Sequence, residues 1–446
     1  MKKILIFTLI VAFMISMLFL GTSCKPEVVE VAEVAEVAEV AEVAEVVEAE
    51  PVTVTFWHIQ TVEEQAELWE ELADEYMAAN PNVTIDITGY ENDNFKAKMT
   101  TVMQGGEPPD LFQSWSGGTM NEYAEAGLLK DITSFLEKDN WGDTFGIGAL
   151  NAFSYQGKYY GAPRDLGMVG FWYNTELFAD AGIDSPPTTW AELLEDCQTL
   201  KDAGITPIAI GEGDKWPGAF YWEYLATRIG GQAAFDAAYS RTGSFADESF
   251  VEAGEKLAEL VAIEPFEAGF LAAGWEADAS VIFANREAAM ILQGQWGAGQ
   301  FDSVDTIGGI GDVLGWFQFP MVEGGAGNPG DAIGGGNGWN VGKDAPDAAV
   351  DFLKYISSVD SQIAQAELGM AIPVVKGAEG GIQTDMLKLI AEGLANAEYY
   401  QLYYDQFLPA AVGSVINDSV QGIFAGTLTP EEVAQAIEDS VVQELD

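Results

Sequence analysis

The residues best suited to binding chemistry are aromatic side chains at strand ends and in loops. Trp57 and His58 end a short apolar run, at the edge where open α/β sheets bind ligands. Trp115 lies in a Ser/Gly loop, and Trp216 lies in GDKWPG, whose polar, turn-forming residues cannot bury it in a helix face. Because an indole ring offers a large flat apolar surface with one N–H donor, this pattern predicts a site for a compound with apolar C–H faces and hydroxyl edges.

Several other side chains can complete such a site, and each also has a purely structural interpretation. Carboxylate and guanidinium groups pair with hydroxyls, so Arg164 and Asp165 can contact a ligand or simply pair with each other. Asp93 and Lys96 can do the same, or form a surface ion pair of little energetic value. Further candidates, which can equally be core, rim or solvated residues, are Trp222, Glu223, Trp296 and Trp339.

Little in the sequence points to catalysis, a metal or a cofactor. His58 is the only histidine, which excludes a histidine-rich metal site and leaves one residue for any Ser/His or Cys/His pair. With 71 acidic residues, carboxylate pairs occur by chance and do not indicate a glycosidase. The glycine-rich residues 334–338 lack the Lys-Ser/Thr of a phosphate loop and indicate a turn. We therefore expect no catalytic residue, no metal and no cofactor.

The composition is strongly acidic, with 19 basic and 71 acidic residues and a formal net charge of −52. Nucleic acids and anionic membrane surfaces bind to basic patches, so the composition disfavours both as partners. Adaptation to a salty exterior explains the charge better than a cationic ligand does. The 446 residues, 48% of them hydrophobic, are enough for two or three domains with sizeable cores.

The N-terminus carries the pattern of an export signal. Lys2 and Lys3 precede an uncharged apolar run, residues 4–20, and small residues then lead to Cys24. Residues 1–23 resemble a bacterial lipoprotein signal peptide, with Gly21 where such signals usually carry leucine, and the resemblance implies a lipid anchor on Cys24. An uncleaved anchor helix and ordinary cleavage are the alternatives. All three place the remainder of the chain outside the cytoplasm.

Residues 24–50 form a low-complexity acidic segment of Val-Ala-Glu triplets. A period of three does not match the 3.6 residues per turn of a helix, and glutamates three apart repel each other on a helix face. We predict a solvated, mostly extended tether, with a partly helical stalk as the alternative.

The remainder of the chain has the pattern of an α/β protein. A strand at 52–57, an amphipathic helix after Thr61 and an alternating strand through residues 83–87 form a predicted βαβ unit. A second βαβ-like run spans 168–210, with Thr188 or Thr189 as the helix cap. Two such units in one chain suggest two lobes with a groove between them.

Segments in order along the chain resemble a known family. They are FWHIQ, GGEPPDLF, QSWSGG, YQGKYYGAPRDLGMVGFWYNTELFADAGI, PPTTWAELLEDCQTLKDAG, NREAAMILQGQWG, GGGNGWNVGKDAPDAAVDFLKYISSVDSQ and GMAIPVVKG. Together they are similar to the extracellular solute-binding proteins of ABC importers, in the sugar-binding group related to maltose-binding protein, over nearly all of residues 51–446. The YYDQF and GTLTPEEVAQAI segments most resemble members that bind raffinose-type or xylo-oligosaccharides.

The resemblance implies a two-lobed periplasmic-binding-protein-like α/β fold of type II with a ligand cleft between hinged lobes. It places lobe I at 51–164 plus 314–356 and lobe II at 166–312 plus 358–446, with hinges near 164–166, 313–316 and 355–358. It also implies that Asn337, in GGGNGW, and Asp405, beside Tyr404 in YYDQ, hold sugar hydroxyls. Family members carry a tryptophan-proline loop facing the groove, which supports Trp216 as a stacking residue.

The function implied is an extracytoplasmic, membrane-anchored, monomeric lipoprotein, periplasmic or on the cell surface. It would bind a sugar, an oligosaccharide by this resemblance, and deliver it to ABC permease subunits without a catalytic step. The alternatives are a polyamine or other cationic-ligand receptor of the same fold, a secreted carbohydrate-active enzyme, and a chemosensory binding protein without its own permease. Adjacent tyrosines at 403 and 404 resemble those of ferric-ion binders, but the wealth of tryptophan favours sugar.

Overall fold

The computed structural model describes residues 50–304 and 310–445. The predicted signal peptide, Cys24 and nearly all of the tether lie outside these ranges. Within them, no helix combines the length and the apolar character needed to cross a bilayer.

One sheet has five strands in the order β2-β1-β3-β12-β6. β1 (Val52–His58) and β2 (Val83–Gly89) run parallel on either side of α1 (Glu63–Ala79) in the chain, so the first predicted βαβ unit is present. β3 (Leu111–Ser114) lies parallel to β1. β12 (Gly338–Val341) returns from far along the chain and pairs antiparallel with both β3 and β6 (Gly161–Pro163).

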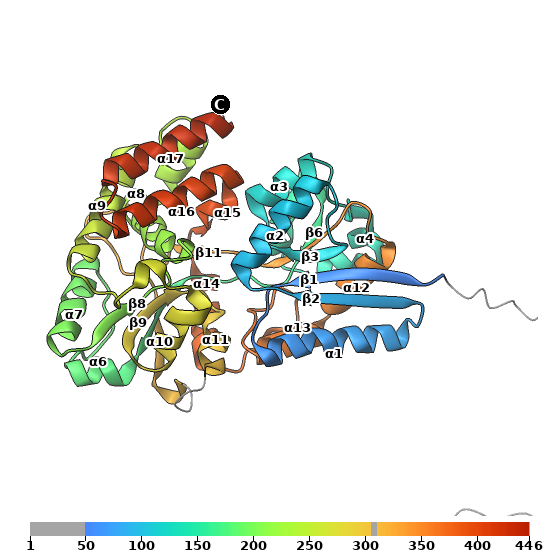
Figure 1. The fold of residues 1–446 in the computed structure, drawn as a ribbon, viewed down its shortest axis with the longest axis horizontal. Coiled ribbons are helices and arrows are strands. Elements are labelled where there is room, and N and C mark those ends of the chain that lie inside the picture. The colour runs from blue at the N-terminus through green and yellow to red at the C-terminus, as the bar shows by residue number, and fades with distance from the viewer. Residues whose placement is uncertain (1–49, 305–309, 446) are drawn as a thin grey trace, which may run out of the picture. The chain divides into compact units, whose positions relative to one another are not determined.

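Helices cover both faces of this sheet, and together they form the first lobe (Figure 1). One core lies between the sheet, α1 and the late helices α12 (Asp347–Ile356) and α13 (Val359–Glu367). The opposite core lies under α2 (Asn92–Gly105) and α3 (Gly117–Glu125). The smaller elements are α4 (Thr133–Glu137), η1 (Lys138–Thr144), α5 (Ile147–Asn151), β4 (Ser154–Tyr155), β5 (Lys158–Tyr159) and η5 (Glu379–Gly381).

The second lobe is built on a four-stranded sheet in the order β10-β7-β9-β8 and has one large core. Its strands are β7 (Gly170–Asn174), β8 (Thr206–Ala209), β9 (Ala288–Gln293) and β10 (Leu314–Phe317), and a two-stranded ribbon adds β11 (Ala332–Gly334) and β13 (Tyr400–Leu402). Its helices are α6 (Thr175–Ala181), α7 (Trp190–Asp202), α8 (Trp216–Tyr239), α9 (Glu248–Ala262), η2 (Phe270–Ala272), η3 (Trp275–Ala279), α10 (Ser280–Ala284), α11 (Gly297–Ser303), η4 (Gly311–Val313), α14 (Asp385–Asn396), α15 (Tyr404–Phe407), α16 (Ala410–Phe424) and α17 (Pro430–Leu445).

The second predicted βαβ unit is wrong in its topology, although its strands and its helix exist. β7 and β8 are not neighbours, because β9 lies between them, antiparallel to β7 and parallel to β8. The helix start is as predicted: the Thr189 hydroxyl accepts from the Glu192 N–H, and the Glu192 carboxylate accepts from the Thr189 N–H. The local sequence pattern thus defines each element. The pairing of β7 and β8 is decided by β9, which begins at Ala288, far beyond the end of β8 at Ala209.

The chain passes between the sheets at positions that differ in part from the predicted hinges. The first passage lies between Pro163 and Gly170. β10 pairs with β7, so residues 314–317 belong to the second lobe rather than to lobe I, and the chain returns only between β11 and β12. Residues of 359–378, such as Val375, contribute to the core of the first lobe, so the third passage also lies later than 355–358. A strand at 314–317 and one at 338–341 carry the same local pattern, and only tertiary pairing separates them.

Candidate functional site

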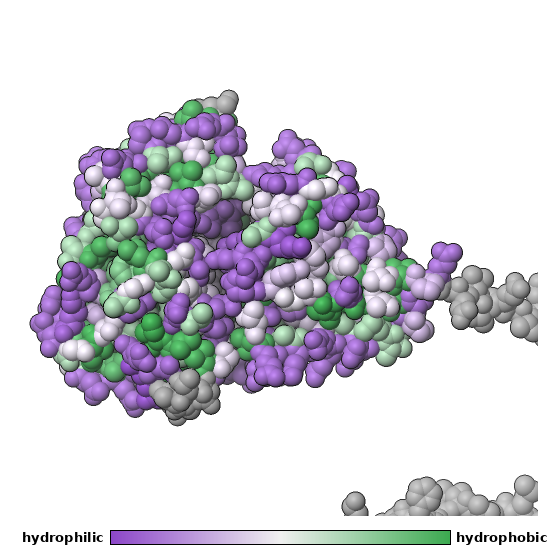
Figure 2. All heavy atoms as spheres, viewed as in Figure 1, coloured by the Kyte–Doolittle hydropathy of each residue, from purple (hydrophilic) through white to green (hydrophobic). Residues whose placement is uncertain are grey.

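A cavity of about 130 Å³ lies between the two lobes. In Figure 2 the surface is hollowed at this place. The first lobe lines it with the loop after β1, the start of α2 and the loop after β3, and the second lobe with the starts of α8, η3 and α11 and the segment after β13. The lining residues are Ile59, Gln60, Thr61, Val62, Gln65, Asn92, Lys96, Trp115, Arg164, Trp216, Phe220, Trp275, Glu276, Trp296, Gln300, Gly335, Asn337, Met370, Tyr403, Asp405 and Gln406.

The second lobe contributes a wall of aromatic side chains. Trp216 begins α8, and Phe220 lies one turn later on the same helix face, with ring centroids 5.3 Å apart. Trp275 and Trp296 each lie 6.3 Å from Trp216, edge-on to it. Tyr403 packs on Phe220 at 4.8 Å. These rings hold one another in place, so their faces are preorganised for stacking.

The first lobe contributes one aromatic platform and one cation. Trp115 follows β3 and is supported by Phe95 of α2, edge-on at 5.7 Å. Lys96, next on α2, places its Nζ 5.5 Å from the centre of the Trp115 ring. The cation therefore lies over an aromatic face at the cavity wall, a contact favoured by the ring quadrupole.

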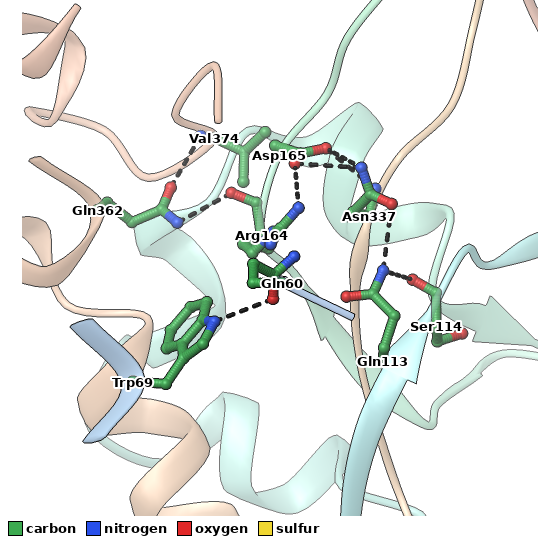
Figure 3. Close-up of polar contacts among 9 residues, drawn as sticks. All are labelled: Gln60, Trp69, Gln113, Ser114, Arg164, Asp165, Asn337, Gln362 and Val374. Atoms are coloured by element: carbon green, nitrogen blue, oxygen red, sulfur yellow. Dashed lines mark hydrogen bonds and ion pairs between the residues drawn. The ribbon is translucent and has the colours of Figure 1, made fainter. Parts of the chain in front are cut away.

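A buried polar network forms where the chain passes between the lobes (Figure 3). Arg164 Nη2 pairs with Asp165 Oδ2 at 2.9 Å, and Asn337 Nδ2 donates to Asp165 Oδ1 at 2.9 Å. Gln113 Nε2 donates to Asn337 Oδ1, and Gln362 Nε2 donates to the Arg164 carbonyl. Burial raises the pKa of Asp165, and Arg164 and Asn337 oppose that shift by stabilising the charged carboxylate. The network fixes the side chains of Arg164 and Asn337 at the cavity.

Several buried polar atoms of the cavity-lining residues have no hydrogen-bond partner among the described residues. They are Arg164 Nε and Nη1, Trp216 Nε1, the Tyr403 hydroxyl and Gln406 Oε1. An unsatisfied buried polar atom costs about 1–3 kcal/mol, so a cluster of them in one cavity marks a place where a ligand's polar groups can bind. Most are donors, and they lie among aromatic faces.

The edge of the cavity brings carboxyl groups of the two lobes together. Thr61 Oγ1 of the first lobe donates to Glu276 Oε2 of the second at 2.9 Å. Asp214, before α8, has its pKa raised to about 7, chiefly by burial, against the lowering effect of the bond from the Trp275 N–H. A hydrogen bond and repulsion from Asp93 raise it further, as does Glu91, and both of these residues belong to the first lobe. Closure of the cleft therefore brings like charges together.

The structure brings seven of the sequence-predicted residues to the cavity: Lys96, Trp115, Arg164, Trp216, Trp296, Asn337 and Asp405. Asp405 Oδ2 accepts from Asn417 Nδ2, and burial raises its pKa while Lys96 opposes the shift. Two more predicted residues lie beside the cavity. Asp165 is fully buried behind Arg164, and Asp93 pairs with Lys96 at 3.8 Å on an exposed surface.

Three predicted aromatic residues lie in the cores instead, which corrects their assignment as ligand-binding residues. Trp222 is fully buried, and its N–H donates to the Phe250 carbonyl. Tyr404 is buried against Phe235 at 4.7 Å. Trp339 is buried in the sheet of the first lobe, where its ring lies 5.9 Å from the Arg164 guanidinium carbon and supports that side chain from behind.

The remaining predicted residues also lie away from the cavity. Trp57 points to the opposite face of β1 from His58 and packs on Tyr90 at 5.2 Å. His58 is buried, and burial, with a smaller effect of Arg164, lowers its pKa to about 4, so it is neutral at pH 7. Glu223 is buried, accepts from the Tyr404 N–H, and has its pKa raised well above the usual value by burial.

Sequence reasoning missed several lining residues. Phe220 lies four residues after Trp216, and helical spacing could have found it. Tyr403 lines the cavity where Tyr404 was predicted, because successive residues around a strand end point in opposite directions. Trp275 begins a short π-helix, for which the sequence carries no signal that we can identify.

Comparison with known proteins supports this geometry. Residues 61–363 match the family described as bacterial extracellular solute-binding protein. The chain belongs to this family. This solute-binding protein is 27% identical over 250 residues to an uncharacterized ABC transporter extracellular-binding protein from Pyrococcus horikoshii, covering 55% of this chain and 56% of that protein. The chain thus spans little more than half the length of that relative.

Two solved structures are similar over nearly all of the described chain. One, from work on xylan utilization by the thermophilic bacterium Caldanaerobius polysaccharolyticus, has a TM-score of 0.82 and 30% identity, covering 87% of this chain and 100% of that one. The other, a chitin oligosaccharide binding protein, has a TM-score of 0.81 and 27% identity, covering 89% and 99%. The predicted family and the predicted two-lobed α/β fold are confirmed.

We predict that the affinity of this solute-binding protein for its ligand falls as pH rises toward about 7. In the closed cleft, Asp214 keeps its proton up to a pKa of about 7, whereas separation of the lobes removes Asp93 and Glu91 and lowers that pKa. Protonation therefore favours closure; this contribution is present at acidic pH and is lost as pH rises through about 7.

Dissociation constants measured by calorimetry from pH 5 to pH 8 test this. Asp214→Asn should remove most of the slope. Asp196→Asn is the matched control, because burial raises the pKa of Asp196 to about 6 on α7, within the second lobe and unaffected by closure. An unchanged slope in Asp214→Asn would contradict the mechanism.

Proposed function

We propose that this protein captures an oligosaccharide outside the cytoplasm and delivers it, chemically unaltered, to the permease subunits of an ABC transporter. The observation that carries the proposal is the cavity that combines an aromatic wall with buried, unpartnered hydrogen-bonding groups. The names of relatives point the same way, since they include a maltotriose-binding protein, probable sugar-binding periplasmic proteins and a chitin oligosaccharide binding protein.

Sugar chemistry matches the cavity group by group. A pyranose ring offers C–H faces, which stack on indole rings such as Trp216 and Trp115. Its hydroxyls accept from the free N–H groups of Arg164 and donate to acceptors such as Gln406 Oε1. Each such bond satisfies a buried protein atom that has no partner among the described residues, so a desolvation penalty is avoided when the cleft closes on the ligand.

A cationic ligand fits the cavity less well, although the chain is acidic overall. Lys96 and Arg164 both line the cavity, and a polyamine would meet these like charges where dielectric screening is weak. Asp405 and Glu276 are the acidic residues of the lining, and Asp405 already faces Lys96. A neutral, hydroxylated ligand avoids this repulsion.

Ligand capture depends on contacts with both lobes. Trp216 and Trp296 belong to the second lobe, whereas Trp115 and Lys96 belong to the first. A ligand held by both sets stabilises the closed arrangement relative to the open one, and the passages between the sheets are the places where the backbone can bend. The closed, ligand-bound protein would then present a different surface from the open protein, and the permease could recognise that difference.

The proposed location rests on the N-terminal sequence. Residues 1–23 would direct export, Cys24 would carry the lipid, and residues 24–50 would tether the folded body to the membrane as a monomer. The folded body would then sample the space beside the permease without leaving the membrane.

Fluorescence titration with neutral oligosaccharides and with spermidine tests the ligand class. Oligosaccharides should change the tryptophan emission and saturate, and spermidine should not, because the cavity carries Lys96 and Arg164. Prolonged incubation should release no new reducing ends. Saturable binding of spermidine alone would favour the cationic-ligand receptor, and release of reducing ends would favour an enzyme.

Trp216→Ala should weaken oligosaccharide binding about tenfold or more, since loss of one stacking face removes about 1.4 kcal/mol or more. Trp57→Ala is the matched control, because Trp57 packs on Tyr90 outside the cavity. Calorimetry on both variants, after circular dichroism has established that each is folded, makes the comparison. Equal affinity of the two variants would remove Trp216 from the site.

Cys24→Ser should release the protein from membranes. The thiol of Cys24 is the proposed attachment point of the lipid, and serine cannot be lipidated by the same chemistry. Fractionation of cells that express the full chain provides the measurement, with Cys197→Ser as the control, since Cys197 is buried in the core. Retention of the serine variant in membranes would favour an uncleaved anchor helix.

A further inference from the structure

A second chamber of about 370 Å³ adjoins the central cavity. Four residues line both spaces and form the neck between them: Lys96, Trp115, Asp405 and Gln406. The first lobe lines the chamber with one face of α2, with β3 and with the start of α3, and the second lobe lines it with α16. The chamber is therefore another part of the space between the lobes, and its neck has residues of both, Lys96 and Trp115 from the first lobe and Asp405 and Gln406 from the second.

The chamber combines an apolar floor with hydrogen-bonding groups. Met99, Met120 and Phe112 form the floor and are nearly fully buried. Gln113 and Ser116, exposed by only 1% and 2%, have unpartnered Gln113 Oε1 and Ser116 Oγ atoms. Gln113 Nε2 already donates to Ser114 O and to Asn337 Oδ1. The remaining polar atom of this side chain, Gln113 Oε1, is an acceptor and requires a hydrogen-bond donor. This repeats the chemistry of the central cavity.

More unpartnered acceptors lie at and beyond the neck. Gln406 Oε1 and Asn417 Oδ1 have no partner among the described residues, while Asn417 Nδ2 is used by Asp405. Acceptors that need donors match the hydroxyl groups of a sugar. Trp115 at the neck supplies an aromatic face along which a chain of sugar units can lie.

The outer ends of the central cavity and of the second chamber differ. The central cavity is bridged at its edge by the bond from Thr61 to Glu276, and Asp93 meets Asp214 there. The second chamber is lined at its outer end by the exposed residues Thr100, Ala410 and Ser414. A long molecule can thus have one end enclosed and the other end in solvent.

We propose that the ligand is a linear oligosaccharide long enough to occupy both spaces, which enters the second chamber past Trp115 and extends toward solvent between α2 and α16. This inference rests on the proposed function and adds the length and direction of the ligand. A pocket for one drug-sized ligand has roughly 300–1,000 Å³. The central cavity has about 130 Å³ and the second chamber adds about 370 Å³, so a ligand of several sugar units needs both spaces.

The test is a set of dissociation constants for a disaccharide, a trisaccharide and a tetrasaccharide of one linkage that the protein binds, measured on the full folded body. Affinity should rise at least tenfold from the disaccharide to the tetrasaccharide. Ser414→Trp, which fills the chamber from an exposed position of α16, should abolish this gain and leave disaccharide affinity unchanged. Thr100→Trp should do the same from the opposite wall.

Ala411→Trp is the matched control, because Ala411 is exposed on the same helix but does not line the chamber, and it should behave as the parent protein. Equal affinity for all three sugars, with no effect of Ser414→Trp, would overturn the extended ligand and leave the proposed function standing. Failure of every sugar to bind would overturn both.

Discussion

The buried pair of Arg164 and Asp165 is the constraint on which the rest of the site depends. Asp165 has no exposed surface, and Arg164 is 5% exposed. A charge buried in this way needs a partner and further hydrogen bonds, or its desolvation cost is not recovered. Asn337 supplies those bonds to Asp165, from both its side chain and its backbone N–H. Removal of either charge would leave the other uncompensated.

The position of this pair makes it structural and functional at once. Arg164 and Asp165 lie on the first passage between the lobes, Asn337 lies on the second, and Gln362 links the Arg164 carbonyl to the Val374 N–H. One network therefore ties together the segments where the backbone must bend. Because Asp165 occupies only one edge of the Arg164 guanidinium, Nε and Nη1 remain for a ligand. Trp339 beneath it limits where the side chain can move.

Features that depend on residues close together in the sequence could be predicted from it, whereas features that depend on contacts between distant segments could not. The capping box at Thr189 and the unit formed by β1, α1 and β2 follow from neighbours in sequence, and both were predictable. The placement of β10 was not, since its pairing with β7 joins segments about 140 residues apart and has no local signature. Hydrophobic periodicity can define a strand, but the partner strand is chosen by the whole core.

The same distinction applies to the site. Trp216 was predicted to line the cavity, and it does, but the reason given was wrong: it is the first residue of α8 and only 9% exposed, not a loop residue kept out of a helix. Trp222 and Trp339 could not be told from it by residue type, since a tryptophan in a core and one at a cavity are chemically alike. Their difference is which face they point to, and for Tyr403 and Tyr404 that difference is a single position. A shift of one residue reverses the side-chain direction along an extended chain.

Charge would make closure of the two lobes depend on a ligand. The body is strongly acidic, and at the cavity edge Asp93 and Glu91 of one lobe meet Asp214 of the other. Inside the cavity, Lys96 places positive charge at the neck and Arg164 places it beside the first passage between the lobes. Repulsion at the edge opposes closure, and the cavity offers aromatic faces together with donors that have no partner among the described residues and that a bound molecule can satisfy. Under the proposed function, closure would be favourable when a hydroxyl-bearing ligand contacts both walls, and the same interactions that select the ligand would also determine when the cleft closes.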